Sequence, residues 1–543
     1  MSNFVEDEKS TSLEDVKQLG LVAGIASLGY VFWVVGVMEM IERLAFYGVK
    51  AVATLYAKDP VSSGGLGVDM NTFGNLLLTW AFVQCMVPIF TGGLSDRYGY
   101  KLTIFASTVV KILGYLLMAW FPHYWGFFAG AMVLATGTAI FKPGIQATLI
   151  KSTTRRNSSL AWGIFYQTVN IGGFLGPLVA GYMRKMEWTY VFYACAAIIS
   201  LNFLMLLTYR EVGKEERLER ARAAKEGHVE RRSLLIESLR ELAKPHVWVY
   251  LGIFSGFWFM FNALFDVLPA HIDDWVNTSD IINTLFAGGR SENPVVNFVV
   301  ITNEQGTAIQ PEGMLNLNAG LIMITCFLFA ALSGKMRATT SMVLGTLLSS
   351  IALFACGYSM FGWICLGAIA IFSVGEMLSS PKFSEFIGNV APHDKKAMYI
   401  GFSQIPLAIG WSLEGKLGPA LYEHYASKDR FSRELLLDRI RSGEVGTPSG
   451  ETLTALAESI KSTPEAVAAT LQSDAAKLVA DLPQGEAFAW LVKLTGGDPR
   501  TLTQIMYDSH NVGMVWYIMG GVGLATAVGI WLYGRWIRTL KTN

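Results

Sequence analysis

Five polar residues in one apolar stretch carry the strongest chemical signal in this sequence. Within EMIERLAFYGVK they recur every three or four positions: Glu39, Glu42, Arg43, Tyr47 and Lys50. This spacing places them on one face of a helix. The flanking residues are apolar, and each charge would cost about 2.5–3.5 kcal/mol at the centre of a membrane-spanning helix in contact with lipid. The face must therefore look into a polar cavity, where carboxylates can hold protons and cationic groups can bind an anion.

Two further charges stand alone in apolar runs, Lys142 and Glu376. Adding them to Glu39, Glu42 and Arg43 predicts a central set of two positive and three negative groups, which one proton would neutralise. Such a set suits a zwitterion, because guanidinium and ammonium groups bind a carboxylate and a glutamate binds an amine. The alternative is an ion-pair network with a purely structural role.

The composition is that of a polytopic membrane protein. Of 543 residues, 52% are hydrophobic and only 16% are charged, whereas a soluble chain carries about 25% charged residues. The net charge is zero, which gives no field for binding nucleic acid. We find no nucleophile–base set, metal cluster or phosphate loop, so we expect neither an enzyme nor a cofactor other than protons. Five cysteines lie in apolar runs and are expected to be buried thiols: Cys85, Cys195, Cys326, Cys356 and Cys365.

Hydrophobic segments of about 20 residues predict twelve membrane-spanning helices. They occupy residues 28–57, 71–95, 102–121, 125–150, 160–183, 188–209, 246–270, 313–334, 338–358, 361–388, 397–421 and 512–534. Lys and Arg gather in the loops that follow the even-numbered spans, which predicts that both termini are cytoplasmic. The first twenty residues lack a basic segment, so we expect no cleavable signal peptide.

The spacing of these spans predicts six segments of the chain. They are a cytoplasmic N-terminal segment (1–27), a six-helix bundle (28–209), a charged cytoplasmic linker (210–245), spans 7–11 of a second bundle (246–421), a helical extracytoplasmic insertion (422–511), and span 12 with a cytoplasmic tail (512–543). Within the insertion, Thr447-Pro448-Ser449 and Thr463-Pro464-Glu465 indicate helix starts.

The loop GGLSDRYGYK between spans 2 and 3 resembles the G-x-L-x-D-R-x-G-R-K loop of the major facilitator superfamily. Its glycines allow a tight turn, and its carboxylate can accept hydrogen bonds, which suits a conformational latch. The resemblance implies an all-α fold of two six-helix bundles with the site at their interface. The residues that match the loop are Gly92, Asp96, Arg97 and Gly99.

Four further stretches resemble the proton-dependent oligopeptide transporters of that superfamily. EMIERLAFYG is similar to ExxERFxYYG, AIFKPGIQATL to GLFKPNIS, FYQTVNIGGFLGP to FYxxINxGSxxGP, and VGEMLSSP to GExxxSP. The resemblance implies that Arg43 and Lys142 bind the substrate carboxylate and Glu376 the amine. It also places Glu39 and Glu42, together with Arg43 and Lys142, in the proton-coupling cluster.

Four other residues are candidate substrate contacts: Tyr47, Asn170, Asn318 and Trp411. Asn170 and Asn318 correspond to asparagines of the family, Tyr47 offers a phenol, and Trp411 an aromatic wall. For Tyr47, Asn318 and Trp411, a role in packing or helix bonding is an open alternative.

Span 7 departs from the family pattern. The family often has FWxxxEQ there, whereas this chain has FWFMFNA, so that Asn262 occupies the position of the glutamate. Asp266 lies one helical turn further on, at the end predicted to face outward. We hypothesise that Asp266 replaces the missing carboxylate in proton coupling, with helix capping or holding a gate shut as the alternatives.

Together these patterns predict a monomeric symporter in the plasma (inner) membrane that imports di- or tripeptides with protons by alternating access. Its partners are the peptide, protons and the lipid bilayer. The alternatives are transport of another zwitterionic or anionic solute, proton-coupled export, and a peptide-binding nutrient sensor.

Overall fold

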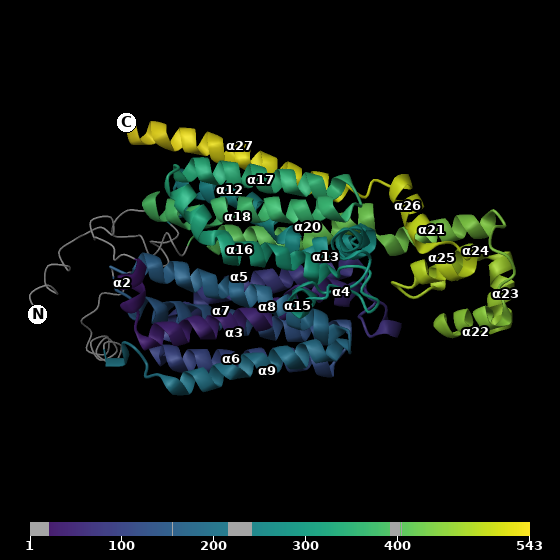
Figure 1. Ribbon diagram of the computed structural model, residues 1–543, viewed down its shortest axis with the longest axis horizontal. Helices are drawn as coiled ribbons and strands as arrows, with labels where there is room; N and C mark the ends of the chain where they lie inside the picture. Colours follow the sequence, from purple (N-terminus) through teal and green to yellow (C-terminus); the bar gives the residue numbers. More distant parts are fainter. Residues whose placement is uncertain are drawn as a thin grey trace, which may run out of the picture.

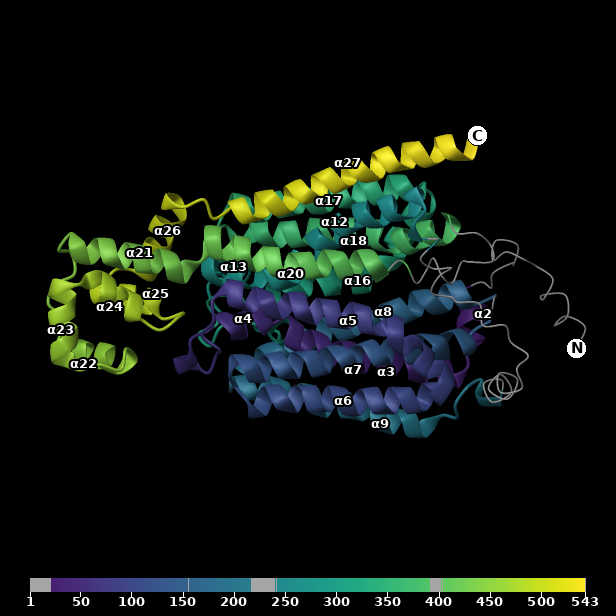
Figure 2. The same cartoon turned by 180° about the vertical axis from the view of Figure 1, so that it is seen from behind.

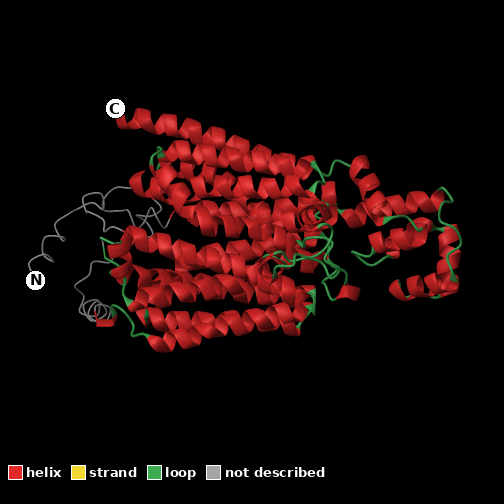
Figure 3. Ribbon diagram, in the orientation of Figure 1, coloured by secondary structure: helices red, strands yellow, loops and turns green. Residues whose placement is uncertain are grey.

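Helices make up nearly all of the ordered framework, and the described residues contain no β-strand (Figure 3). The structure is a computed structural model that describes residues 21–542 except 155, 216–239, 241, 391–401 and 403. Most of the charged linker predicted at 210–245 therefore lies outside the described residues.

Twelve long helices in the described part of the chain correspond to the twelve predicted spans. Six form the N-terminal bundle: α3 (Tyr30–Lys50), α5 (Met70–Tyr98), α6 (Tyr100–Trp120), α7 (Tyr124–Lys151), α8 (Ser158–Arg184) and α9 (Trp188–Thr208). Six form the C-terminal bundle: α12 (Pro245–Asp266), α16 (Pro311–Gly334), α17 (Ala338–Tyr358), α18 (Gly362–Val390), α20 (Gln404–Ala426) and α27 (Met514–Thr542). The two bundles lie side by side with their helices roughly parallel (Figures 1 and 2).

Two pairs of helices join the bundles. α5 packs against α20, and α8 packs against α16. Among the described residues, eight helices are long and apolar enough to cross a membrane: α6, α7, α9, α12, α16, α17, α18 and α27. The other four long helices are α3, which carries the charged face, and α5, α8 and α20 from the interface between the bundles. Because neighbouring helices cover them, these four can carry more polar residues than a lipid-facing helix.

The first and seventh spans are each broken near the same end of the molecule, where the sequence predicts continuous helices over 28–57 and 246–270. After α3 the chain turns and resumes as α4 (Ala53–Lys58), and after α12 it resumes as α13 (Leu268–Trp275). Pro269 lies in the first turn of α13. It lacks a backbone N–H and restricts the residue before it, which explains why α12 stops just ahead of it.

Short elements connect the bundles' helices at this end: η2 (Val61–Ser63), α14 (Ser279–Phe286) and α15 (Pro294–Val299). α2 (Leu21–Ala26) and the C-terminal end of α27 both lie at the opposite end of the molecule (Figure 1). Both described ends of the chain thus lie on one side, as an even number of crossings requires.

Six short helices form a compact projection between α20 and α27 (Figure 1). They are α21 (Lys428–Arg441), α22 (Gly450–Ser459), α23 (Pro464–Ser473), α24 (Ala475–Asp481), α25 (Ala487–Thr495) and α26 (Pro499–Ser509). Two begin where the sequence indicates, with Ser449 and Thr463 as N-caps. Because α20 continues to Ala426, the insertion begins about five residues later than the predicted position 422. We call the side of the molecule that carries it the insertion end.

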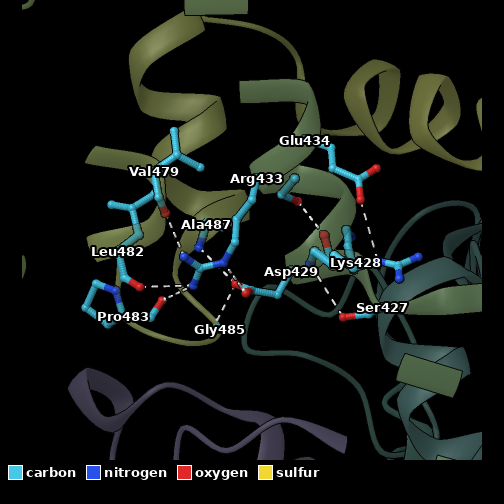
Figure 4. A network of polar contacts seen from close by, with 12 residues as sticks. Ser427, Lys428, Asp429, Arg433, Glu434, Val479, Leu482, Pro483, Gly485 and Ala487 are labelled. Atoms are coloured by element: carbon cyan, nitrogen blue, oxygen red, sulfur yellow. Dashed lines mark hydrogen bonds and ion pairs between the residues drawn. The ribbon is translucent and has the colours of Figure 1, made fainter. Parts of the chain in front are cut away.

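Arg433 holds the turn after α24 onto α21 (Figure 4). Its guanidinium pairs with Asp429 and donates to the carbonyl oxygens of Val479, Leu482 and Pro483 at 2.7–3.0 Å. The Asp429 carboxylate in turn accepts hydrogen bonds from the backbone N–H groups of Gly485 and Ala487. These contacts hold α21, α24 and the start of α25 together within the insertion. All five cysteines are free thiols, as expected, and Cys326 alone among them is only partly buried.

Candidate functional site

The charged face of α3 is buried and internally paired. Arg43 Nε lies 3.1 Å from Glu39 Oε1, and Arg43 Nη2 lies 2.5 Å from Glu42 Oε2. Helix α8 approaches this face closely because it has glycine at position 172. A Cβ there would lie 2.8 Å from the Cβ of Arg43 and 2.5 Å from the Met40 carbonyl oxygen. The predicted helical face therefore exists, and Glu39, Glu42 and Arg43 form ion pairs with one another inside the N-terminal bundle.

A lysine that the sequence reasoning missed completes this cluster. Lys111 of α6 is fully buried, and its Nζ lies 3.4 Å from Glu42 Oε1 and 3.7 Å from the ring centroid of Phe141. Its position alone in an apolar span was the signal that could have found it. With Lys111, the predicted balance of two positive and three negative groups becomes three and three. The conclusion that one proton is needed for neutrality is therefore wrong for this set of charges.

Four of the predicted substrate contacts line one cavity between the bundles. They come from four helices: Tyr47 from α3, Asn170 from α8, Asn318 from α16 and Glu376 from α18. Phe261 and Phe265 of α12 add apolar walls. Asn318 holds Glu376 in place, because its amide donates to Glu376 Oε2 and to Ser373 Oγ at 3.0 Å each. Asn170 is bonded within its own helix, to the carbonyl oxygen of Tyr166.

The cavity is contracted in this conformation. Its volume is about 40 Å³, close to the roughly 30 Å³ that one water molecule occupies in the liquid. A dipeptide cannot enter until the bundles move apart.

The remaining predicted contacts lie outside the cavity lining. Lys142 makes no hydrogen bond or ion pair with another described residue, although the charges of Glu39, Glu42 and Arg43 act on it. Trp411 packs edge-on against Trp258, with ring centroids 6.2 Å apart. Tyr47 connects the two regions, since the charges of Arg43 and Glu376 both act on it.

Three sets of ion pairs join the bundles at the insertion end, and we call them the gate. Lys50 of α3 pairs with Asp266 of α12, and Arg184 of α8 pairs with Glu312 of α16. Lys58, at the end of α4, lies 2.6 Å from both carboxylates of α13, Asp273 and Asp274. In addition, Thr54 Oγ1 donates to the carbonyl oxygen of Asp266. The gate closes the insertion end of the cavity.

Asp266 belongs to a buried group that spans three helices. The Asn262 amide nitrogen lies 2.5 Å from Asp266 Oδ2 and 2.7 Å from Oε2 of Glu414, a residue of α20. Glu414 is fully buried and was also missed from the sequence, although it too stands in an apolar span. The structure thus places a carboxylate directly against the asparagine that replaces the family's glutamate. Asp266, for its part, holds the gate through Lys50.

The residues that match the superfamily loop lie at the end of α5 and in the turn that follows it. Gly92, Asp96 and Arg97 lie within the last turns of α5, and their side chains are outside the described part of the structure. Gly99 ends that helix with φ +105°, a conformation that favours glycine, and forms the tight turn into α6 that the sequence predicts.

One acid beside the gate is expected to make gate closure depend on pH. Burial, together with the negative charge of Asp273, raises the pKa of Asp59 to about 6. When the gate opens and Asp59 meets water, its pKa returns toward about 3.9. The closed gate therefore binds this proton more tightly, and lowering the pH from 7 to 5 should favour closure by up to about tenfold.

The check is the rate at which an impermeant thiol reagent labels a cysteine introduced as Ala51→Cys in the cavity. Labelling from the insertion side should slow as the pH falls through 6. With Asp59→Asn added, only the general slowing caused by loss of the thiolate should remain, without the steeper fall near pH 6. If the steeper fall near pH 6 persisted in that double variant, the pH dependence of gate closure would belong to a group other than Asp59.

Comparisons with known proteins agree with this architecture. A family model described as Major Facilitator Superfamily matches residues 30–413. Over 179 residues the chain is 27% identical to the uncharacterized transporter YclF of Bacillus subtilis (strain 168), and the match spans 32% of this chain and 36% of that relative. Over 417 residues it is 22% identical to the multidrug resistance protein MdtH of Photorhabdus laumondii, spanning 75% of this chain and 89% of MdtH.

The fold is also similar to a solved structure from work on substrate recognition in proton dependent oligopeptide transporters. The TM-score is 0.59 at 15% identity, covering 94% of this chain and 99% of the other. The similarity confirms the expected fold of two six-helix bundles.

Proposed function

The chain belongs to the Major Facilitator Superfamily, and from that premise we propose that it is a symporter that imports di- or tripeptides together with protons. The observation that carries the proposal is the cavity between the bundles, where a buried carboxylate, Glu376, is held by Asn318 beside Tyr47, Asn170 and apolar walls. The structurally similar oligopeptide transporter supports the same substrate class.

The two charged ends of a zwitterionic peptide would meet groups of opposite charge on the two bundles. Glu376 of the C-terminal bundle takes the amine, and Arg43 and Lys142 of the N-terminal bundle take the carboxylate. Lys142 is the better placed of the two cations to accept a substrate, because it has no partner among the described residues, whereas Arg43 is held by two glutamates. Glu39, Glu42, Arg43, Lys142 and Asp266 are proposed to couple proton and peptide movement.

Alternating access explains why the cavity is contracted. With the gate closed, substrate exchanges only through the opposite end, and opening the gate separates each of its ion pairs. We place the insertion end outside the cell and both termini in the cytoplasm of the plasma (inner) membrane, with the protein acting as a monomer. The basic loops after the even-numbered spans support this orientation.

Uptake into liposomes tests the proposal. Moving one net charge inward gains about 2.3 kcal/mol per 100 mV, and one unit of pH gradient adds about 1.4 kcal/mol per proton. Labelled dipeptide should therefore accumulate when the exterior is acidic and the interior negative, and an uncoupler should release it. Uptake that responds to neither gradient would contradict symport and favour a facilitator or a sensor.

The match with MdtH supports a second candidate, proton-coupled export of an apolar or cationic compound. The phenylalanines that line the cavity would suit such a substrate. The same liposomes separate the two functions. An exporter moves a fluorescent cationic dye against its gradient in exchange for protons and ignores dipeptides in competition assays.

A further inference from the structure

The buried group around Asn262 contains more acid than base. Asp266 is 2% exposed and Glu414 is fully buried. The titratable groups that act on Glu414 are Asp266 of α12 and Lys50 of α3. Beside it, α5 presents Leu77 and Leu78 to the neighbouring Gly415. Two carboxyl groups thus share one ammonium group, and full ionisation would bury a net negative charge, which is strongly unfavourable.

The hydrogen bonds indicate where a compensating proton sits. Lys50 pairs with Asp266, which therefore stays ionised. The two hydrogens of the Asn262 amide are used by Asp266 and Glu414. The carboxyl groups of Asp266 and Glu414 thus lie against the same amide nitrogen, 2.5 and 2.7 Å from it. If both were ionised, Lys50 would neutralise only one of them and a net negative charge would stay buried, so one of them holds a proton. The proton belongs on Glu414.

These groups are divided between the two bundles. Lys50 comes from α3 in the N-terminal bundle, while Asp266 and Glu414 come from α12 and α20 in the C-terminal bundle. When the gate opens, Lys50 leaves two carboxylates behind in contact with water. When it closes, Lys50 returns and neutralises only one of them. For this group to carry no net charge when the gate closes, the second carboxylate must therefore take up one proton from the water.

We propose that Glu414 carries the transported proton and stands in for the carboxylate that position 262 lacks. The inference rests on the proposed symport and gives the role of proton carrier to Glu414, while Asp266 takes part in coupling through its ion pair with Lys50. Solvent water donates the proton to the Glu414 carboxylate while the insertion end is open, and Glu414 returns it to water when the opposite end is open. The cluster around Arg43, with three positive and three negative groups including Glu376, closes without a proton and therefore does not set this requirement.

Glu414→Gln tests the proposal, because glutamine has the shape and hydrogen bonds of the protonated acid but cannot release a proton. With a one-unit pH gradient and no membrane potential, the wild-type protein should accumulate dipeptide up to about tenfold, the limit for one coupled proton. Glu414→Gln should stop at a ratio of about one. Its exchange of internal for external peptide should continue, because exchange needs no net proton movement.

Glu312→Gln is the matched control. Glu312 is also a fully buried gate carboxylate, but it has its own partner, Arg184. This change should alter the rate of uptake and leave the final accumulation ratio at the wild-type value. Glu414→Asp should retain coupling with a shifted pH profile, whereas a purely structural role would make the Asp and Gln variants similarly defective.

The double variant Asn262→Glu with Glu414→Gln moves the carboxylate to the position found in the family and should restore proton-driven accumulation. The double variant also tests the proposal if Glu414→Gln alone is poorly folded. A well-folded double variant without proton coupling would overturn the proposal. Proton-driven accumulation by Glu414→Gln would overturn it as well. Failure of the wild-type protein to respond to a pH gradient would instead refute the symport function itself.

Discussion

Arg43→Met is expected to lower the free energy of unfolding by about 3–5 kcal/mol, the usual cost of leaving buried charges without their partner. Glu39 and Glu42 are 5% and 1% exposed, and Arg43 pairs with both. After the change, Lys111 alone would face Glu42, and Glu39 would have no ion-pair partner among the described residues. Peptide uptake should be lost together with stability. The checks are thermal unfolding in detergent and uptake in liposomes.

Lys142→Met is the variant to compare with Arg43→Met. Lys142 makes no ion pair with a described residue, so its removal should leave the unfolding temperature close to that of the wild-type protein. It should nevertheless weaken binding of peptides that have a free carboxylate, and affect peptide amides much less. If both variants lost the same amount of stability, the distinction between a paired Arg43 and an unpaired Lys142 would fail.

Glu376→Gln is expected to weaken binding of peptides with a free amino terminus by about 2–5 kcal/mol, at least about 25-fold in Kd. Glu376 lies in a narrow cavity and forms no ion pair with a described cation, so the substrate amine would be its direct partner, and glutamine keeps its size and its contact with Asn318. An N-acetylated analogue of the same peptide should bind both forms of the protein with similar, weak affinity.

The measurement is competition binding with the matched pair of free and acetylated peptides. A change that weakens both peptides by the same factor would show that Glu376 shapes the cavity without binding the amine. Asn318→Ala helps to separate these cases, since it frees Glu376 from its support while keeping the charge.

Much of the framework follows from local sequence alone. Most described helices begin and end within a few residues of the spans predicted from hydropathy, although α27 continues to Thr542, eight residues past its predicted end, and Ser449 and Thr463 cap helices where the sequence indicates. These features depend on residues close together in the chain, where hydrophobic length, helical periodicity and capping act directly. The shared face of Glu39, Glu42 and Arg43 is also a local property, because a helix places residues three and four apart side by side.

The sequence did not reveal how charges from different helices combine. Lys111 was overlooked because nothing near it in the chain marks it as a partner of Glu42, 69 positions away, and its absence made the central charge balance wrong. The breaks after Lys50 and Asp266 were also missed, since hydropathy continues through them. Pro269 was the available signal for the second break.

The sequence by itself determined that this chain crosses the membrane in long helices, which of them carry charge, and that position 262 lacks a carboxylate. Only the tertiary structure decided which buried polar and charged side chains contact one another. It placed Glu414 of α20 against Asn262 and Asp266 of α12, and brought Lys50 to them from the other bundle. The physical reason is that hydrophobicity and helical period act along the chain, whereas the neutrality of a buried cluster depends on side chains that meet only when separate helices pack.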